Sequence, residues 1–491
     1  MSKIKHKFEI PEEVRNISQV LSSTKFDNYL VGGCVRDLLL SRKPKDWDIT
    51  TSANPAEIEA LFEKTFYENA YGTVGIVHET PTEESTRVVE VTPYRTESTY
   101  SDFRRPDEVK WAKTLEEDLK RRDFTVNALA YSISEEKLID LFEGERDIEK
   151  RVIRTVGNPD ERFSEDALRM LRALRFASEL GFAIDSDTLA AVEKNKNLLV
   201  HVSKERIRDE FIKIVMSPAP SVALGLATQL GLLQFISPEF EKGIGMEQNK
   251  AHIYTVWEHL LRALDHAAKK EFPLHVRLAA LFHDIAKPHT MKILNGERTF
   301  YGHDVVGARL TRNILTDLKF PREIIEKVVK LVRWHMFFSE TETITLSAVR
   351  RIVRNVGPDL IWDLMNVRNA DRTGMGRPKE TTYRLRKYHS MIEEVMRDPV
   401  SVRQLNINGG DIMSLTETGP GPHVGYILEI LLSEVLEDPK KNERKHLESR
   451  VLALMTLSPK ELEKLGIEAR EKNQGEDEKE IEEIKEKYKV E

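Results

Sequence analysis

The chain has 491 residues, of which 40% are hydrophobic, and a formal net charge of −7 at pH 7. This length exceeds what one hydrophobic core supports, so the sequence predicts three or four domains. The acidic balance excludes a protein held on nucleic acid by its overall charge and leaves RNA binding to local basic patches. Cys34 is the single cysteine, which excludes an intramolecular disulfide framework.

The sequence shows no pattern typical of membrane insertion. Residues 1–8 lack the apolar core of a signal peptide, and no later apolar run approaches the ~20 residues that a membrane span needs. Together with the single cysteine, these features predict a cytoplasmic protein with no membrane partner.

A glycine turn near the N-terminus is the first feature that indicates a function. The apolar residues 29–31 predict a short strand, Gly32 and Gly33 a turn, and residues 35–40 the start of a helix. Backbone N–H groups at such a turn face an open space and can cradle a phosphate. An ordinary corner between a strand and a helix has the same pattern, so the turn alone does not distinguish a phosphate site from a structural turn.

Two aspartates follow in the stretch Lys45-Asp-Trp-Asp-Ile-Thr50. In a β-type run, Asp46 and Asp48 leave the same face, while Trp47 points into the opposite layer. Two neighbouring carboxylates can hold a partly hydrated Mg²⁺ and share it with substrate phosphates, as in nucleotidyl transfer. Asp-x-Asp alone is usually a solvated loop or a cap. With the preceding turn, and with Arg36 free to meet a triphosphate, it predicts a catalytic site.

Helices are predicted at residues 11–21 and 55–62, and paired strands at 74–77 and 87–92. Glu90 lies in the middle of the last strand, where a third carboxylate can face Asp46 and Asp48. A buried carboxylate there is costly unless it meets a metal or a cation, so metal binding is favoured over a structural ion pair. The polar segment from Tyr94 to Pro106 has no clear period and predicts a mobile loop at the rim of the site.

After residue 141 the strand patterns nearly cease, and the sequence predicts helices of period 3.6 with short turns. The expected fold class is therefore α+β, a mixed-sheet head on a helical body. The helix at residues 163–176 is predicted to be capped by Ser164 and to carry Arg169, Arg172 and Arg175 in a row. Such a row repels itself unless it is solvated or faces an anion such as a triphosphate or an RNA phosphate.

Four motifs stand in a fixed order, namely Gly32-Gly-Cys-Val-Arg-Asp37, Asp46-Trp-Asp48, Arg121-Arg-Asp-Phe-Thr-Val-Asn-Ala128 and Glu165-Asp-Ala-Leu-Arg169. Their order and spacing closely resemble the class II tRNA nucleotidyltransferases, which are the CCA-adding enzymes and the bacterial poly(A) polymerases. The resemblance covers about residues 20–220. It implies template-independent addition of C, C and A to the 3′ end of tRNA from CTP and ATP, with Mg²⁺ as cofactor and pyrophosphate as product. A-only addition and poly(A) synthesis are the nearest alternatives.

The resemblance also implies roles for single residues. Asp46 and Asp48 resemble the Mg²⁺ ligands, and Glu90 resembles the third catalytic carboxylate. Asp166 and Arg169 resemble the pair that reads the base, and Ser203-Lys-Glu-Arg-Ile-Arg-Asp-Glu210 resembles the neck motif that follows. Further nucleotide contacts are implied for Gly32, Gly33, Arg36, Arg122, Asn127, Arg172 and Arg175.

The chemistry of the base-reading pair agrees with this assignment. An aspartate accepts and an arginine donates, which suits the Watson–Crick edges of cytosine and adenine and opposes those of uracil and guanine. The implied domains are a nucleotidyltransferase head over residues 1–155, a helical neck over 156–245 and a helical tail over 377–491. The tail is expected to contact the acceptor arm of tRNA.

A second group of metal-ligand side chains lies within residues 250–375, comprising His259, His283, Asp284, His303, His335 and Asp371. Their order resembles the HD-type phosphohydrolases and implies an HD domain over residues 246–376. Imidazole with carboxylate suits Mn²⁺, Ni²⁺ or Co²⁺ better than Mg²⁺ alone. Hydrolysis of phosphomonoesters or 2′,3′-cyclic phosphates of nucleotides or RNA is one alternative, and an inert RNA scaffold is the other. The oligomeric state is left open.

Overall fold

The computed structural model describes residues 7–67, 72–98, 108–248, 253–336, 345–376, 383–396 and 405–470. The chain divides into two compact units. The first comprises Met1–Glu247, Thr255–Arg277 and Asn313–Arg322, and the second comprises Gln248–Tyr254, Leu278–Arg312 and Glu323–Glu491. No helix among the described residues is long and apolar enough to cross a membrane. The predicted bounds of the four domains stay predictions.

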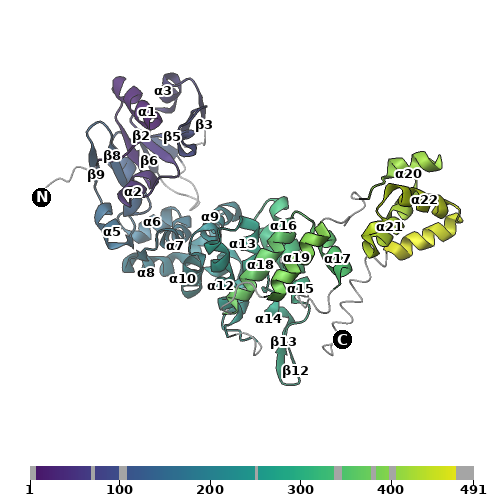
Figure 1. Ribbon diagram of the computed structural model, residues 1–491. Coiled ribbons are helices and arrows are strands. Elements are labelled where there is room, and N and C mark those ends of the chain that lie inside the picture. Colours follow the sequence, from purple (N-terminus) through teal and green to yellow (C-terminus); the bar gives the residue numbers. More distant parts are fainter. Residues whose placement is uncertain are drawn as a thin grey trace. The chain divides into compact units, whose positions relative to one another are not determined.

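A seven-stranded mixed sheet forms the N-terminal part of the first unit (Figure 1). Its strand order is β3-β4-β5-β2-β1-β8-β9, and β2 and β5 pair in parallel while the other neighbours are antiparallel. The predicted mixed sheet is therefore confirmed. The strands are β1 (Asn28–Val31), β2 (Trp47–Thr51), β3 (Thr65–Tyr67), β4 (Val74–Val77), β5 (Val88–Pro93), β8 (Leu129–Ser132) and β9 (Lys137–Asp140).

Short helices accompany this sheet close to where the sequence predicts them. Helix α1 (Glu12–Ser23) buries Val14, Ile17 and Leu21, which recur at helical spacing. Helix α3 (Pro55–Leu61) has proline in its first turn and a capping box between Asn54 and Glu57. The other helices of the head are α2 (Gly33–Leu39), α4 (Leu115–Lys120) and α5 (Gly144–Lys150).

The segment predicted as a loop from Tyr94 to Pro106 begins as a strand. Arg95–Ser98 (β6) pairs antiparallel with Glu108–Trp111 (β7), and Tyr94 is buried. The loop prediction was wrong for these residues, because backbone pairing with a later strand leaves no period in a short polar sequence. Residues 99–107 lie outside the described residues.

Helices make up the rest of the first unit, joined to the head by a short parallel pair, β10 (Val152–Ile153) and β11 (Ala183–Ile184). The single helix predicted at residues 163–176 is instead two helices that break at Asp166. Ser164 lies inside the first of them, where its Oγ donates to the carbonyl of Asp160, so the predicted cap is wrong. The helices are α6 (Pro159–Glu165), α7 (Leu168–Leu180), α8 (Ser186–Asn195), α9 (Lys204–Met216), α10 (Pro220–Leu230), α11 (Leu233–Ile236) and α12 (Val256–Lys269).

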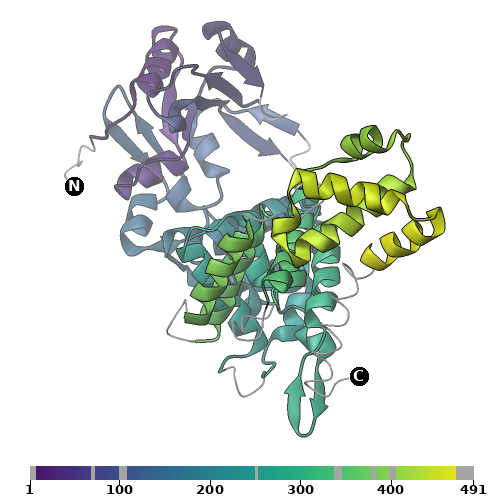
Figure 2. The same ribbon diagram turned by 45° about the vertical axis from the view of Figure 1, so that its right-hand side comes forward.

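The second unit is helical, as predicted, except for the hairpin of β12 (Lys292–Leu294) and β13 (Glu297–Thr299), which Figure 2 shows in teal. Three of its later helices pack on one another around Ile412, Leu431 and Leu447, and a further helix over residues 459–470 follows them. The helices that follow the first unit's α12 are α13 (Leu274–Phe282), α14 (Lys287–Thr290), α15 (His303–Asp317), α16 (Arg322–Trp334), α17 (Leu346–Val356), α18 (Ile361–Gly374), α19 (Tyr383–Met396), α20 (Gly409–Thr416), α21 (Pro422–Glu437) and α22 (Arg444–Met455).

Candidate functional site

The turn between β1 and α2 brings the chain against the predicted aspartates. Gly32 has φ +77°, in the left-handed region that favours glycine, and a Cβ built there would lie 2.9 Å from Nη1 of Arg122 and 3.7 Å from Oδ2 of Asp48. A Cβ at Gly33 would lie 4.0 Å from Oδ1 of Asp46. Two side chains of the predicted metal pair therefore converge on the backbone of the predicted phosphate cradle.

Asp48 and Glu90 are neighbours on adjacent parallel strands. The register of β2 and β5 pairs these two residues directly, so both half-buried side chains leave the same face of the sheet. Asp46 is exposed and lies in the bend just before β2, and Trp47 is buried. The predicted proximity of Glu90 to Asp48 is confirmed, and the catalytic roles of the three carboxylates stay predictions.

A buried carboxylate that sequence analysis did not single out holds two arginines of the third motif. Oδ1 of Asp118 accepts from Nε and Nη2 of Arg121 at 2.9 and 2.7 Å, and Oδ2 accepts from Nη2 of Arg122 at 3.2 Å. Burial acts to raise the pKa of Asp118, but the charges of both arginines outweigh it and lower that pKa. Asp118 precedes Arg121 by three residues and Arg122 by four, and side chains at these spacings meet on a helix. The sequence could therefore have revealed both pairs.

Arg36 is not free, as the sequence suggested, but buried and bonded within the protein. Its Nη1 donates to Oδ1 of Asn127 at 2.7 Å, and its Nε donates to Oδ1 of Asp37 at 2.9 Å. A guanidinium removed from water needs such partners, which is why Arg36 is not free. Contacts of Arg36 and Asn127 with a nucleotide stay predictions.

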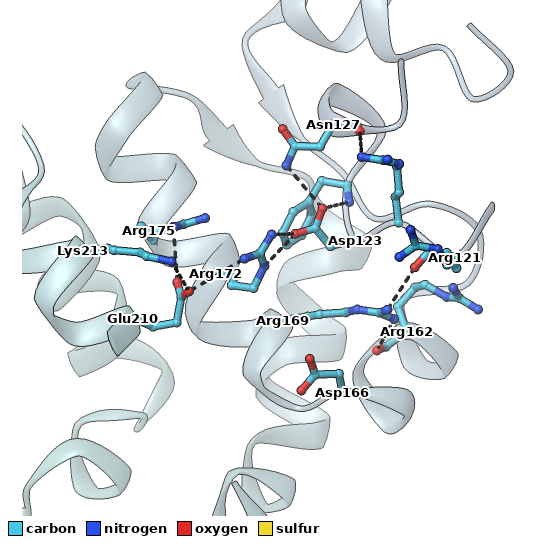
Figure 3. Close-up of polar contacts among 12 residues, drawn as sticks. Arg121, Asp123, Asn127, Arg162, Asp166, Arg169, Arg172, Arg175, Glu210 and Lys213 are labelled. Carbon is cyan, nitrogen blue, oxygen red and sulfur yellow. Dashed lines mark hydrogen bonds and ion pairs between the residues drawn. The ribbon is translucent and has the colours of Figure 1, made fainter. Parts of the chain in front are cut away.

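The row of arginines on α7 faces carboxylates of the protein itself, which neither predicted alternative described (Figure 3). Asp123 accepts from Nε and Nη2 of Arg172 at 2.7 and 2.5 Å. Burial acts to raise the pKa of Asp123, but the adjacent Arg172 lowers it to about 2. Nε of Arg175 lies 3.3 Å from Oε2 of the buried Glu210. The row therefore links the third motif to α9.

The predicted base-reading pair does not share one helix face. Asp166 ends α6 with an extended backbone, whereas Arg169 lies in the first turn of α7. Nη1 of Arg169 donates to Oε2 of Glu165 at 2.6 Å. Both oxygens of Asp166 accept from the guanidinium of Arg206, at 3.1 and 2.7 Å. Arg206 lies within the predicted neck motif, but its partner could not be read from the sequence.

A cluster of histidines and carboxylates in the second unit contains five of the six residues predicted for the HD site. Nε2 of His303 lies 3.2 Å from Oδ1 of Asp284 and 3.3 Å from Nε2 of His335. Potential ligand atoms of these three residues all lie within 4.8 Å of one another. Nε2 of His283 lies 3.3 Å from Oδ2 of Asp284 and 3.6 Å from Oδ1 of Asp371.

Backbone carbonyls orient the three imidazole rings of this cluster. Because a carbonyl oxygen only accepts, each Nδ1 carries a hydrogen and each Nε2 faces the carboxylates, an arrangement typical of metal ligands. The three bonds join Nδ1 of His283, His303 and His335 to the carbonyls of Ala280, Phe300 and Val332 at 2.9, 2.6 and 2.7 Å.

The charge state of His283 follows from its carboxylate neighbours. Burial acts to lower its pKa, but Asp284 and Asp371 outweigh that effect and raise the pKa of His283 to about 10. A metal bound at Nε2 would displace the proton, so its binding would release protons. His259 is buried on α12, within the first unit, and its membership of the cluster stays a prediction.

Three family models match successive parts of the chain. Residues 28–154 match the poly A polymerase head domain, and residues 250–375 match the HD domain. Residues 181–244 match a model described as "Probable RNA and SrmB- binding site of polymerase A". The chain therefore contains a poly A polymerase head domain and an HD domain. The predicted resemblance to the poly(A) polymerases and CCA-adding enzymes and the predicted HD domain are thus confirmed, and nucleotidyltransferases with this head use a divalent metal.

Curated relatives match this chain over about half of their own length. The CCA-adding enzyme of Geobacillus sp. (strain WCH70) is 47% identical over 226 residues, which are 46% of this chain and 54% of that protein. The CCA-adding enzyme of Enterococcus faecalis is 48% identical over 234 residues, which are 47% of this chain and 54% of that protein. The chain therefore spans about half the length of the curated relatives it matches.

Solved structures of family members extend the likeness in fold. The CCA-adding enzyme of Bacillus stearothermophilus in complex with CTP has a TM-score of 0.68 and 28% identity, with 90% of this chain and 96% of that chain covered. The CCA-adding enzyme of Thermotoga maritima complexed with tRNA has a TM-score of 0.51 and 19% identity, with 90% and 94% covered. The second likeness concerns the fold alone.

Proposed function

We propose that this chain adds C, C and A to the 3′ end of tRNA, using CTP and ATP and releasing pyrophosphate. The observation that carries the proposal is the juxtaposition of the Gly32 turn with Asp48, which is in register with Glu90. The fold shared with the Bacillus stearothermophilus enzyme, which was solved with CTP, supports the choice of nucleotide. The tail over residues 377–491 is proposed to contact the acceptor arm.

The carboxylates of the head fit the oxygen ligands that Mg²⁺ prefers. Asp46 and Asp48 would hold the ion, and bound Mg²⁺ would neutralise charge that develops on the transferring phosphate. Glu90 adds a third carboxylate beside Asp48, on the same face of the sheet. The N–H group of Gly32 donates to the carbonyl of Leu129 at 3.3 Å, so the turn would offer the N–H group of Gly33 to the triphosphate without a side chain in the way.

Incubation with single nucleotides tests the proposal against its nearest rivals. Three tRNA substrates are needed, ending before CCA, after C and C, and after the complete CCA. The proposal predicts C addition to the first and A addition to the second, with no extension of the third. An A-only enzyme would label only the second substrate, and a poly(A) polymerase would extend all three with ATP. Either of those patterns would contradict the proposal.

Asp166→Ala is expected to weaken the choice of base. Removing the carboxylate deletes the acceptor for the amino group of cytosine or adenine and also the group that repels O4 of uracil. Lost bonds to a buried edge are worth ~1–3 kcal/mol, so the preference for CTP over UTP should fall roughly ten- to a hundredfold. The measurement is kcat/KM for all four nucleotides on the same tRNA. An equal loss for every nucleotide would instead indicate a structural role.

Gly32→Ala is expected to impair addition more than folding. The backbone of Gly32, at φ +77° and ψ −132°, costs a residue with a Cβ ~1–3 kcal/mol, and the new methyl group would press on the guanidinium of Arg122, 2.9 Å away. We expect kcat/KM to fall at least tenfold while thermal unfolding shifts by a few degrees. Gly181→Ala is the matched control, because it also has positive φ, +71°, but nothing lies within 4 Å of its Cβ. Equal rate losses in both variants would contradict this account of Gly32.

A second candidate function belongs to the histidine cluster. We propose that it binds Mn²⁺, Ni²⁺ or Co²⁺ and hydrolyses phosphomonoesters or 2′,3′-cyclic phosphates. The observation in favour is that three Nε2 atoms, each oriented through Nδ1, face Asp284 and Asp371. Imidazole and carboxylate together suit these metals.

A further inference from the structure

We propose that Arg206 is a positioning residue that sets the choice of base by acting through Asp166. The proposal rests on the proposed nucleotide addition and deepens it. Arg206 comes from the first turn of α9, which packs on α7, and Asp166 joins α6 to α7. Two segments that are 40 residues apart in the chain therefore meet at the predicted base-reading carboxylate.

The guanidinium of Arg206 binds the carboxylate of Asp166 in a fork. Nη1 donates to Oδ1 at 3.1 Å and Nη2 donates to Oδ2 at 2.7 Å, so both oxygens act as acceptors. A planar fork of this kind fixes the rotation of a carboxylate as well as its position. The side chains are only 30% and 18% exposed, for Arg206 and Asp166, so solvent screens the pair less than it would a surface pair.

The same carboxylate also holds the start of α7. Oδ1 of Asp166 accepts from the backbone N–H of Leu168 at 3.2 Å. A carboxylate offers about four acceptor positions, and these three bonds use both positions on Oδ1 and one on Oδ2. The remaining position on Oδ2 can receive one donor from a base edge. Asp166 therefore presents a single acceptor in a fixed direction.

Arg169, the second member of the pair, is also held by groups other than its partner. Nη2 of Arg169 donates to the carbonyl of Arg121 at 3.0 Å, and Nη1 donates to the carbonyl of Arg162 at 3.1 Å (Figure 3). Arg169 thus has its own supports, and Arg206 is the side chain that supports Asp166. Both members are oriented before a nucleotide arrives, which is what discrimination between similar bases requires.

Discrimination follows from the fixed acceptor. The amino groups of cytosine and adenine donate to Oδ2, whereas O4 of uracil and O6 of guanine are acceptors that this oxygen repels. Without Arg206, the carboxylate of Asp166 can rotate, so that O4 of uracil no longer meets an acceptor held in one direction. Loss of Arg206 should therefore relax the choice of base rather than slow all nucleotides equally.

The test compares Arg206→Ala and Arg206→Lys with Arg208→Ala as a matched control on the same helix. Arg208 bonds Asp209 and the carbonyl of Lys319, so its removal leaves Asp166 untouched. Two quantities are measured for CTP and UTP with Mg²⁺, namely Kd without tRNA and kcat/KM on tRNA that lacks CCA. A ratio within one preparation does not depend on the folded fraction.

The preference for CTP over UTP should fall about tenfold in Arg206→Ala, by less in Arg206→Lys, and not at all in Arg208→Ala. In an Asp166→Ala background, Arg206→Ala should cause no further loss of preference. An unchanged preference in Arg206→Ala, including an equal change in the binding of CTP and of UTP, would overturn the inference. Wild-type protein that prefers CTP in binding but adds nothing to tRNA would overturn the proposed function alone.

Discussion

Asp48→Asn is expected to abolish nucleotide addition while tRNA affinity stays within a few-fold of wild type. Asp48 faces the Gly32 turn and is paired with Glu90 across β2 and β5. Loss of a metal ligand removes several kcal/mol of stabilisation from a transition state in which charge develops on phosphate, without removing contacts to RNA. The measurements are single-turnover rates at saturating CTP and tRNA affinity by filter binding.

Glu84→Gln is the matched control for Asp48→Asn. Glu84 is an exposed carboxylate near the start of β5 that pairs with Arg87, so its loss should leave the rate of addition unchanged. Because several kcal/mol correspond to more than a hundredfold in rate, an Asp48→Asn rate above roughly a tenth of wild type would refute the metal assignment.

His283→Ala combined with Asp284→Ala is expected to remove hydrolysis of phosphomonoesters and cyclic phosphates and to leave nucleotide addition nearly intact. Asp284 contacts the Nε2 atoms of His283, His303 and His335, so the variant loses the centre of the cluster. Both activities are assayed on one preparation with added Mn²⁺, Ni²⁺ or Co²⁺, together with the metal content of the protein.

Removal of Asp284 also leaves the buried Lys287 without a carboxylate 2.6 Å away, which endangers folding. His303→Ala therefore serves as a second variant, because it removes a ligand and keeps that ion pair. His289→Ala, at an exposed histidine of the neighbouring α14, is the control. Undiminished hydrolysis and metal content in both cluster variants would contradict the assignment of this site.

Local patterns in the sequence predict much of the fold and the types of residue in the site. Alternation of apolar and polar residues indicates β5, and the placement of Glu90 beside Asp48 follows from that strand. Helical periodicity indicates α1, and proline in the first turn indicates α3. The histidine cluster could be predicted because its ligands have distinctive chemistry and occur in a distinctive order.

The partners of buried charges could not be predicted, because they depend on contacts between distant segments. Arg36 and Asn127 are 91 residues apart, and Arg172 and Asp123 are 49 apart. Both arginines were predicted to contact a nucleotide. Because their guanidinium groups are at least partly buried, each also needs a hydrogen-bond acceptor within the protein. Such a choice between partners leaves no periodicity in the sequence.

The break between α6 and α7 has the same kind of cause. Residues 163–176 read as one continuous amphipathic helix, but the backbone turns at Asp166 and its carboxylate accepts from Leu168 and Arg206. Aspartate competes with helical backbone bonding through its own side chain, which favours an end over an interior position. The tertiary partner Arg206 adds to this preference, and only the structure reveals it.

Sequencing of the product end tests the central claim most directly. Wild-type protein is incubated with Mg²⁺, all four nucleotides and tRNA that ends before its CCA, and the 3′ ends of the products are sequenced. The account predicts that nearly all extended molecules end in C, C and A, with no fourth nucleotide. Products that carry a run of A, or U and G in proportion to their supply, would contradict it.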